Sequence, residues 1–196
     1  PVFLKSWPAA PRSEQRGSFT TVMNWRSYRG VRLRGRFFGT KDVEFKRFWD
    51  LPRLTTQPLA VALGVSGVRN AKGVFLKLHA KGWQVVNATL HTHSLQNYRH
   101  FIRTSKAEFT VAKNLYVRLA TGWLSERSAC YLASSRPVLR QDTGLGSVMP
   151  VGQGLLTFKT LEEAVEGIGR INADYRSHSH AARAWAQEHL DSRKVL

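Results

Sequence analysis

The chain has a single cysteine, Cys130, and no apolar run near the length of a membrane span. A lone cysteine excludes an internal disulfide and leaves no cysteine cluster for zinc, which favours a reducing cytoplasm. The lack of an apolar run of roughly 18 residues excludes a transmembrane helix, and the start of the chain shows no signal-peptide pattern. We therefore expect a cytoplasmic protein. The apolar neighbours of Cys130 indicate a small buried side chain.

Motifs that mark several enzyme classes are also missing. The sequence has no Walker A motif, no GxSxG and no HExxH. His91, His93 and His100 invite a metal-site hypothesis, but the nearest carboxylate in sequence is Glu108, so we predict no metal site. Three further histidines lie in or beside a basic, polar helix and are interpreted as surface residues: His178, His180 and His189.

Acidic residues are scarce, since 13 Asp and Glu stand against 30 Lys and Arg, for a net charge of +17. The imbalance is concentrated in residues 1–100, which hold 17 basic and 4 acidic residues. A positive field of this size attracts nucleic acid, anionic lipid or a phosphorylated small molecule alike. Charge therefore predicts an anionic partner without giving its class.

The remaining composition is that of one folded domain, with 196 residues of which 42% are hydrophobic. Residues 1–18 carry three prolines and no periodicity, which is typical of a linker or an arm. We predict that residues 19–196 form the domain. Because the chain starts at Pro1, we expect it to be a piece of a longer protein.

Apolar patterning predicts strands that alternate with helices. The expected strands are 19–25, 58–65, 83–88, 108–112, 136–141 and 155–158, and a loop or small hairpin is expected around residues 30–39. The expected helices are 42–50 (ended by Pro52), 71–81, 96–106, 127–135 and a closing helix that follows Thr160. This alternation predicts an α/β, Rossmann-like parallel sheet with helices on both faces.

The most informative segment is 122–154, in which a short helix leads to a buried strand and a glycine-rich loop. Ligands of open α/β sheets bind at the carboxyl ends of strands. Gln141 and Asp142 are candidate acceptors for sugar hydroxyls, and the N–H groups of Thr143 and Gly144 are candidates for an anion. The alternative is a polar surface turn.

The start of the same helix is a second candidate, because helix amino ends bind phosphate and an arginine suits a diphosphate. Its residues are Ser125, Glu126, Arg127 and Ser128. The alternative interpretation makes Ser125 a helix cap and Glu126 with Arg127 a surface pair. Asn24 and Trp25 join the candidates at the carboxyl end of the first strand, although Trp25 also fits the core.

Several of these segments together resemble one family. VAKNLYV (111–117), GWLSERSACYLASSRPVLRQDTG (122–144), VGQGLLTF (151–158) and LEEAVEGI (161–168) are similar to the carboxyl-terminal part of bacterial glycosyltransferases of the two-domain GT-B architecture. The resemblance implies the nucleotide-sugar-binding half of such an enzyme, whose acceptor domain would precede Pro1. It implies a donor surface that includes Asn24, Trp25, Ser125 to Ser128, Tyr131 and Gln141 to Gly144.

The chain also departs from the family pattern. Gln153 occupies a position where the family has Glu, and Ser135 occupies one where the family has Gly. A broader GT-B clan has two glutamates at positions that Gly122 and Cys130 occupy in this chain. These differences leave open whether transfer retains or inverts the sugar configuration.

The function that we expect is donor binding in a hexosyltransferase-like enzyme. Arg127 and Lys113 would hold the diphosphate of a nucleotide sugar, which is the substrate, and no cofactor is expected. The acceptor is unknown, and we expect no catalysis from this chain alone. Two alternatives remain: a basic nucleic-acid-binding module that uses residues 25–53, and an inactive fragment.

Overall fold

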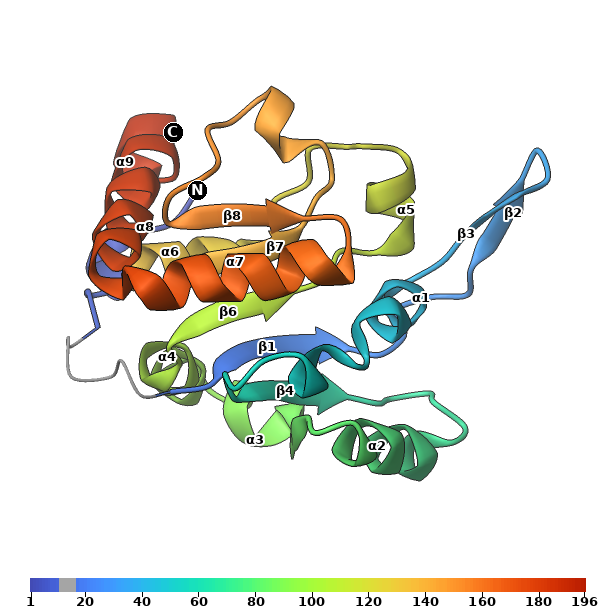
Figure 1. Ribbon diagram of the computed structural model, residues 1–196. Coiled ribbons are helices and arrows are strands. Elements are labelled where there is room, and N and C mark those ends of the chain that lie inside the picture. The colour runs from blue at the N-terminus through green and yellow to red at the C-terminus, as the bar shows by residue number, and fades with distance from the viewer. Residues whose placement is uncertain (11–16) are drawn as a thin grey trace.

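A computed structural model describes residues 1–10 and 17–196 and shows a six-stranded parallel sheet (Figure 1). The strand order is β5-β4-β1-β6-β7-β8, and every neighbouring pair runs parallel. The strands are β1 (Phe19–Asn24), β4 (Leu59–Gly64), β5 (Gln84–Asn87), β6 (Ala107–Thr110), β7 (Val138–Gln141) and β8 (Leu155–Phe158). The predicted α/β, Rossmann-like fold is confirmed, and each of the six strands lies within its expected range or one residue outside it.

Helices cover both faces of this sheet, and each face has its own apolar core. One face packs against α1 (Lys41–Phe45), the 3-10 turns η3 (Lys46–Phe48) and η4 (Leu51–Arg53), α2 (Ala71–Ala80) and α7 (Leu161–Ala173). The other face packs against α3 (Ala88–Thr92), α4 (Leu95–Thr104), α6 (Glu126–Ala133) and α8 (Tyr175–His189). The shorter elements are η1 (Leu4–Ser6), α5 (Asn114–Arg118), η5 (Leu145–Ser147) and α9 (Ser192–Val195).

The helix expected over 42–50 differs most from the prediction. It is one turn of α-helix, α1, which tightens into η3 and then η4. Pro52 lies in the first turn of η4, where its missing N–H has no helical partner to lose, so it starts a new turn instead of ending a helix. The short α3 was not predicted.

His178 also corrects the sequence interpretation, because it is buried and not a surface residue. Its Nδ1 accepts the Gly154 N–H at 3.1 Å, which requires that nitrogen to be unprotonated. Burial, together with Arg170, lowers the pKa of His178 below its ordinary value. The neutral ring therefore joins α8 to the loop before β8.

The first ten residues pack against the domain. Val2, Leu4 and Trp7 are buried with residues of α6 and α8. The Val2 N–H donates to the carbonyl of Leu190, and Arg183 donates to the carbonyl of Trp7. Residues 11–16 of the segment expected to be a linker lie outside the described residues.

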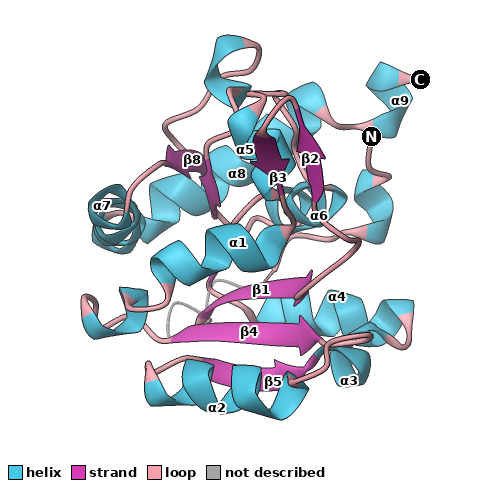
Figure 2. Cartoon of the chain, turned by 90° about the vertical axis from the view of Figure 1, so that its right-hand side faces the viewer, coloured by secondary structure: helices cyan, strands magenta, loops and turns pink. Residues whose placement is uncertain are grey.

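The hairpin alternative for residues 30–39 is confirmed. β2 (Val31–Leu33) pairs antiparallel with β3 (Arg36–Phe38), and the two strands project from the body of the domain (Figure 1). Both turn residues, Arg34 and Gly35, have positive φ, the backbone that a tight two-residue hairpin turn requires. Figure 2 shows β3 beside α5, where Arg118 donates to the carbonyl of Phe37 at 2.5 Å.

Candidate functional site

A cavity of about 490 Å³ lies at the carboxyl edge of the sheet. The ends of β1 and β6, the loops that follow them and the first turn of α6 form most of its wall. This is the edge at which open α/β sheets bind ligands. Its polar and aromatic lining residues are Asn24, Ser27, Lys41, Thr92, Thr110, Lys113, Tyr116, Trp123, Ser125, Glu126, Arg127 and Arg140.

Four basic side chains from four different segments line this cavity: Lys41, Lys113, Arg127 and Arg140. Two carboxylates accompany them: Glu126 on the wall, and Glu108, which is fully buried beside Arg127. Bases outnumber acids, so the cavity has a net positive charge and suits an anion.

Arg127 is held by three acceptors. Its Nε donates to Oε1 of Glu108, its Nη1 to the carbonyl of Val22 at 2.6 Å and its Nη2 to Oγ1 of Thr110 at 2.7 Å. Burial alone would lower the pKa of Arg127, but the neighbouring Glu108 carboxylate raises it above its ordinary value. The guanidinium is therefore charged and fixed in place, and a guanidinium has five N–H groups, so two of them remain for a ligand.

Arg140 ties the β7 end to the cavity wall. It donates to the carbonyl of Trp123 and to Oγ1 of Thr143, the latter at 3.1 Å. Burial lowers the pKa of Arg140 to about 10, which still leaves it charged at neutral pH. Its Nη1 is buried and has no hydrogen-bond partner in the part of the chain that the structure describes.

Lys41 is partly buried at the start of α1, and its ammonium group has no hydrogen-bond partner among residues 1–10 and 17–196. Burial, and then the charge of Arg127, hold the pKa of Lys41 well below its ordinary value, while Glu108 acts in the opposite direction. A bound anion would favour the charged ammonium. Lys41 therefore lines the cavity as a basic group that a bound anion would help to protonate.

Aromatic rings surround Lys113. Its Nζ lies 5.2 Å from the ring centre of Tyr28 and 5.6 Å from that of Tyr116, within the range of cation–π contacts. Tyr116 stacks on Trp123, with ring centres 5.0 Å apart and planes at 26°. Trp123 is 38% exposed, so a flat aromatic surface adjoins the cations of the cavity.

The predicted site residues divide into three groups: residues that line the cavity, residues of the core and residues of the loop 141–144. Asn24, Lys113, Ser125, Glu126 and Arg127 line the cavity, and Ser125 also caps α6, because its Oγ accepts the Arg127 N–H at 3.2 Å.

Three predicted residues lie in the core. Trp25 stacks on Trp49 with ring centres 6.2 Å apart, Ser128 is fully buried, and the Tyr131 hydroxyl lies 2.6 Å from Oγ1 of Thr20. None of the three lines the cavity. Their place on the inner face of α6 and at the end of β1 gives them a packing role.

The loop residues 141–144 also lie outside the cavity lining. Gln141 is buried, donates to Oε2 of Glu44 and accepts the Ala112 N–H. Asp142 accepts the Gly144 N–H at 2.9 Å, which fixes a turn in which Gly144 has φ +79. Thr143 donates to the carbonyl of Trp123 at 3.0 Å. Of the two side chains expected to bind sugar, Asp142 therefore fixes the turn of the loop, and Gln141 joins the end of β7 to α1 and to the segment after β6.

Sequence reasoning missed seven polar or aromatic residues of the cavity wall: Ser27, Lys41, Thr92, Thr110, Tyr116, Trp123 and Arg140. Arg140 had a usable signal, since a charged residue in the apolar strand PVLRQ needs a partner or a function. Lys41 had none, because only the folded chain brings the start of α1 to the end of β6.

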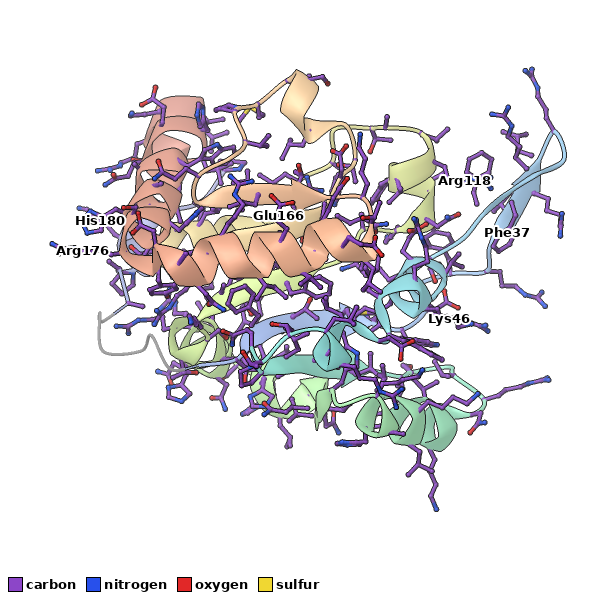
Figure 3. The ribbon with its side chains drawn as sticks, in the orientation of Figure 1. Phe37, Lys46, Arg118, Glu166, Arg176 and His180 are labelled. Carbon is purple, nitrogen blue, oxygen red and sulfur yellow. The ribbon has the colours of Figure 1, made fainter. Side chains whose placement is uncertain are left out.

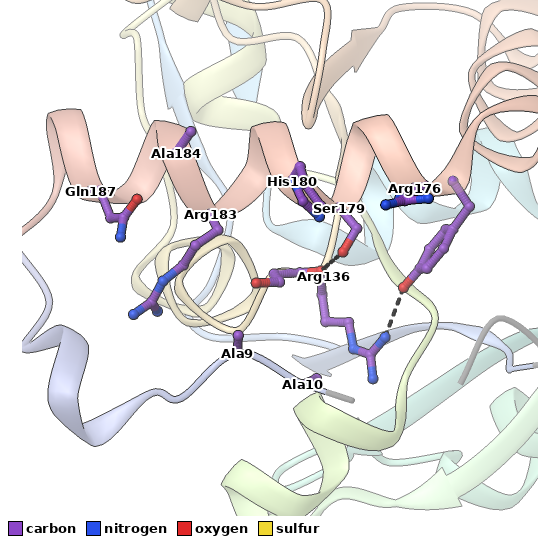
Figure 4. Close-up of a pocket in the computed structure, with 11 residues that line it drawn as sticks. Ala9, Ala10, Arg136, Arg176, Ser179, His180, Arg183, Ala184 and Gln187 are labelled. Carbon is purple, nitrogen blue, oxygen red and sulfur yellow. Dashed lines mark hydrogen bonds between the residues drawn. The ribbon is translucent and has the colours of Figure 1, made fainter. Parts of the chain in front are cut away.

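A second cavity, of about 560 Å³, lies at the opposite edge of the sheet (Figure 4). Arg136, which directly precedes β7, donates to the Tyr175 hydroxyl at 2.8 Å there, and Arg183 and His180 of α8 line it. Ala10 on its wall adjoins residues outside the described ranges. This second cavity lies at the amino ends of the strands. The cavity at the carboxyl edge is therefore the better candidate for a ligand site.

Neither a metal cluster nor a membrane-spanning helix is found in the described part of the chain. Within residues 1–10 and 17–196, no group of three or more His, Cys, Asp or Glu side chains is placed to hold a metal ion. In the same ranges no helix combines the length and the apolar character needed to cross a bilayer.

Comparison with known proteins gives a likeness in fold. No protein-family model matches the chain, and no curated protein matches it significantly. Among solved structures, TarM is similar to this chain with a TM-score of 0.62, at 12% identity over 96% of this chain. A S. aureus TarM variant in complex with fondaparinux, alpha-GlcNAc-glycerol and UDP is similar with a TM-score of 0.59. The chain spans only 35% of the length of TarM.

Two further structures give the same result. The carboxyl-terminal domain of a group 1 family glycosyl transferase (LpcC) from Francisella tularensis matches at a TM-score of 0.62 and 10% identity, over 98% of this chain and 100% of its own. Sucrose-phosphate synthase from Thermosynechococcus elongatus matches at 0.61 and 11%, over 99% of this chain and 48% of its own. None of these likenesses supports nucleic-acid binding. The chain has the Rossmann-like fold of the carboxyl-terminal domain of GT-B glycosyltransferases.

Proposed function

We propose that this chain is the donor-binding domain of a glycosyltransferase, and that the cavity at the carboxyl edge holds the diphosphate of a nucleotide sugar. The observation that carries the proposal is the convergence of Lys41, Lys113, Arg127 and Arg140 on one cavity next to the amino end of α6. A diphosphate is a compact polyanion, and helix N–H groups and arginine side chains are its usual partners.

The cations also fit the chemistry of sugar transfer. Negative charge grows on the departing diphosphate as the bond to the sugar breaks, and fixed positive groups stabilise that charge. Arg127 meets this requirement, because Glu108 and two further acceptors hold it before any ligand arrives. We assign the sugar hydroxyls to Asn24 and Glu126, which line the cavity, in place of Gln141 and Asp142.

The similar structures support a nucleoside diphosphate as the first probe. The TarM variant structure contains UDP, together with sugar-containing molecules. For this chain the acceptor is proposed to bind to a second domain, and transfer would require both domains. Binding of the donor nucleotide requires only this one, so it can be measured on the chain itself.

Calorimetric titration with UDP tests the proposal. Lys113→Ala removes a cation that lines the cavity, and we expect this variant to bind UDP about tenfold more weakly than the wild type. Lys77→Ala is the matched control, because Lys77 is an exposed lysine of α2 that does not line the cavity. Equal affinity in both variants would remove Lys113 from the site. If ADP, GDP and UDP all failed to bind the wild type, the proposal would be wrong.

A further inference from the structure

No residue of the hairpin β2–β3 lines the donor cavity, and the hairpin projects from the body of the domain (Figure 1). Phe37 stands on it apart from the sheet, and Arg118 of α5 lies at its base (Figure 3). The Tyr28 hydroxyl donates to the carbonyl of Gly39, also at the base. All residues from 31 to 37 are exposed. An isolated two-stranded hairpin is marginally stable in water, so contact with a partner would stabilise the exposed part of this arm.

The register of the hairpin gathers its aliphatic side chains. Val31 pairs with Phe38 and Leu33 pairs with Arg36, so these four side chains share one face. Val31 is 57% exposed and Leu33 is 62% exposed. Leu33 directly precedes the turn at Arg34, so aliphatic carbon lies at the end of the arm farthest from the domain.

The same arm is strongly basic. Residues 28–38 contain no acidic residue and four exposed arginines: Arg29, Arg32, Arg34 and Arg36. Arg32 lies over the Phe37 ring, with 5.9 Å between its Cζ and the ring centre. Long arginine side chains place their carbon stems along apolar surface while the guanidinium reaches phosphate.

We propose that the hairpin is a membrane-binding arm for an anionic lipid surface. Its arginines bind the phosphates of the headgroups, and Val31 and Leu33 enter the boundary between headgroups and acyl chains. A soluble polyanion such as RNA would satisfy the arginines and leave both aliphatic side chains in water. An anionic bilayer matches the charge and the aliphatic side chains together.

The position of the arm gives the interaction a direction. The hairpin follows the carboxyl end of β1, and Asn24 at that end lines the donor cavity. An arm that rests on a bilayer therefore holds the donor cavity near the membrane surface. The proposal stands on the hairpin alone and does not need the donor site to be correct.

Co-sedimentation with lipid vesicles tests the proposal. We expect the chain to bind vesicles of phosphatidylcholine and phosphatidylglycerol in equal parts, and to stay in solution with phosphatidylcholine alone. The double variant Val31→Ser with Leu33→Ser should lower the partition coefficient about tenfold. Arg34→Ser should lower it roughly fivefold. Leu76→Ser is the matched control, because Leu76 on α2 is 59% exposed, and it should bind like the wild type.

Two results would overturn the proposal. One is anionic-vesicle binding that the Val31 and Leu33 substitutions leave unchanged, since the arm would then be only an electrostatic patch. The other is an arginine variant that loses affinity for an RNA hairpin while its vesicle binding is unchanged. All the substituted side chains are exposed, so each variant should keep the wild-type circular dichroism spectrum and melting temperature.

Discussion

Arg127, which lines the cavity at the carboxyl edge of the sheet, forms an ion pair with Glu108, and its Nε lies 2.5 Å from Oε1 of Glu108. Glu108 lies on β6 and is fully buried, and Arg127 lies in the first turn of α6. The same guanidinium reaches the carbonyl of Val22 on β1. Arg127 therefore joins two strands and a helix, and its role in holding the fold cannot be separated from its place in the cavity.

Removal of Arg127 should destabilise the protein. Arg127→Ala leaves the Glu108 carboxylate buried without its partner, and we expect the free energy of unfolding to fall by about 3–5 kcal/mol. Urea unfolding measures the change. Arg176→Ala is the matched control, because Arg176 is exposed on α8, and it should change stability by less than about 0.5 kcal/mol.

A second variant separates the pair from simple packing. Arg127→Met with Glu108→Leu removes both charges, and it should recover much of the stability that Arg127→Ala loses. If Arg127→Ala unfolds at the wild-type urea concentration, the ion pair is not a structural element. Nucleotide affinity measured on Arg127→Ala alone would mix the two roles, so Lys113 is the better residue for testing donor binding.

Gly154 should tolerate no side chain. It has φ +76, and a Cβ there would lie 2.3 Å from the backbone nitrogen of Ala182 in α8. We expect Gly154→Ala to lower the free energy of unfolding by about 3 kcal/mol, through strain at the left-handed backbone and displacement of α8. Thermal unfolding followed by circular dichroism measures this loss.

Gly169 provides the control for that substitution. It lies in α7, is exposed and has a φ that is ordinary for a helix. In the described part of the chain, no atom of another segment lies within 4 Å of the place that a Cβ would occupy. Gly169→Ala should therefore stabilise the protein by about 0.5–1 kcal/mol. Equal destabilisation by both substitutions would contradict the close contact between Gly154 and α8.

Nucleotide binding should be linked to proton uptake at Lys41. In the free protein, burial and then Arg127 hold the pKa of Lys41 well below its ordinary value, and a bound diphosphate raises that pKa. Between the lower pKa of the free state and the higher pKa of the bound state, binding takes up a proton. Affinity is therefore greatest below the free-state pKa and falls as pH rises toward the bound-state value.

Calorimetry in buffers of different ionisation enthalpy measures this uptake. Lys41→Met keeps most of the length of the side chain and removes its titratable ammonium group, so the part of the proton uptake that Lys41 contributes should disappear. The ligand's own titration is common to both proteins and cancels in the comparison. Identical proton uptake in wild type and Lys41→Met would show that Lys41 does not sense the ligand.

The pattern of apolar residues in the sequence was sufficient to predict the strands of the sheet and most of the helices. Continuous apolar runs such as 58–65 occur where both faces of a strand are covered, and the glycines around residues 30–39 left room for the hairpin that forms. The start of α6 was also readable, because Ser125 precedes an apolar helical pattern.

The cavity itself was predictable only in part. A glycine-rich loop after a strand can face a ligand or close upon itself, and composition does not distinguish the two. The loop at Asp142 and Thr143 closes upon itself, because these side chains form hydrogen bonds with backbone atoms of the same loop and of the segment before α6. Lys41 reaches the cavity from a helix remote in sequence, so its role depends on tertiary structure that no local pattern encodes.

The most direct test of donor binding is a crystal structure of this chain with UDP. We expect the diphosphate in the cavity at the carboxyl edge, within hydrogen-bonding distance of Lys41 or Lys113 and near the first turn of α6. A diphosphate bound in the cavity beside Arg136 and α8, or on the basic hairpin, would contradict donor binding at the carboxyl edge.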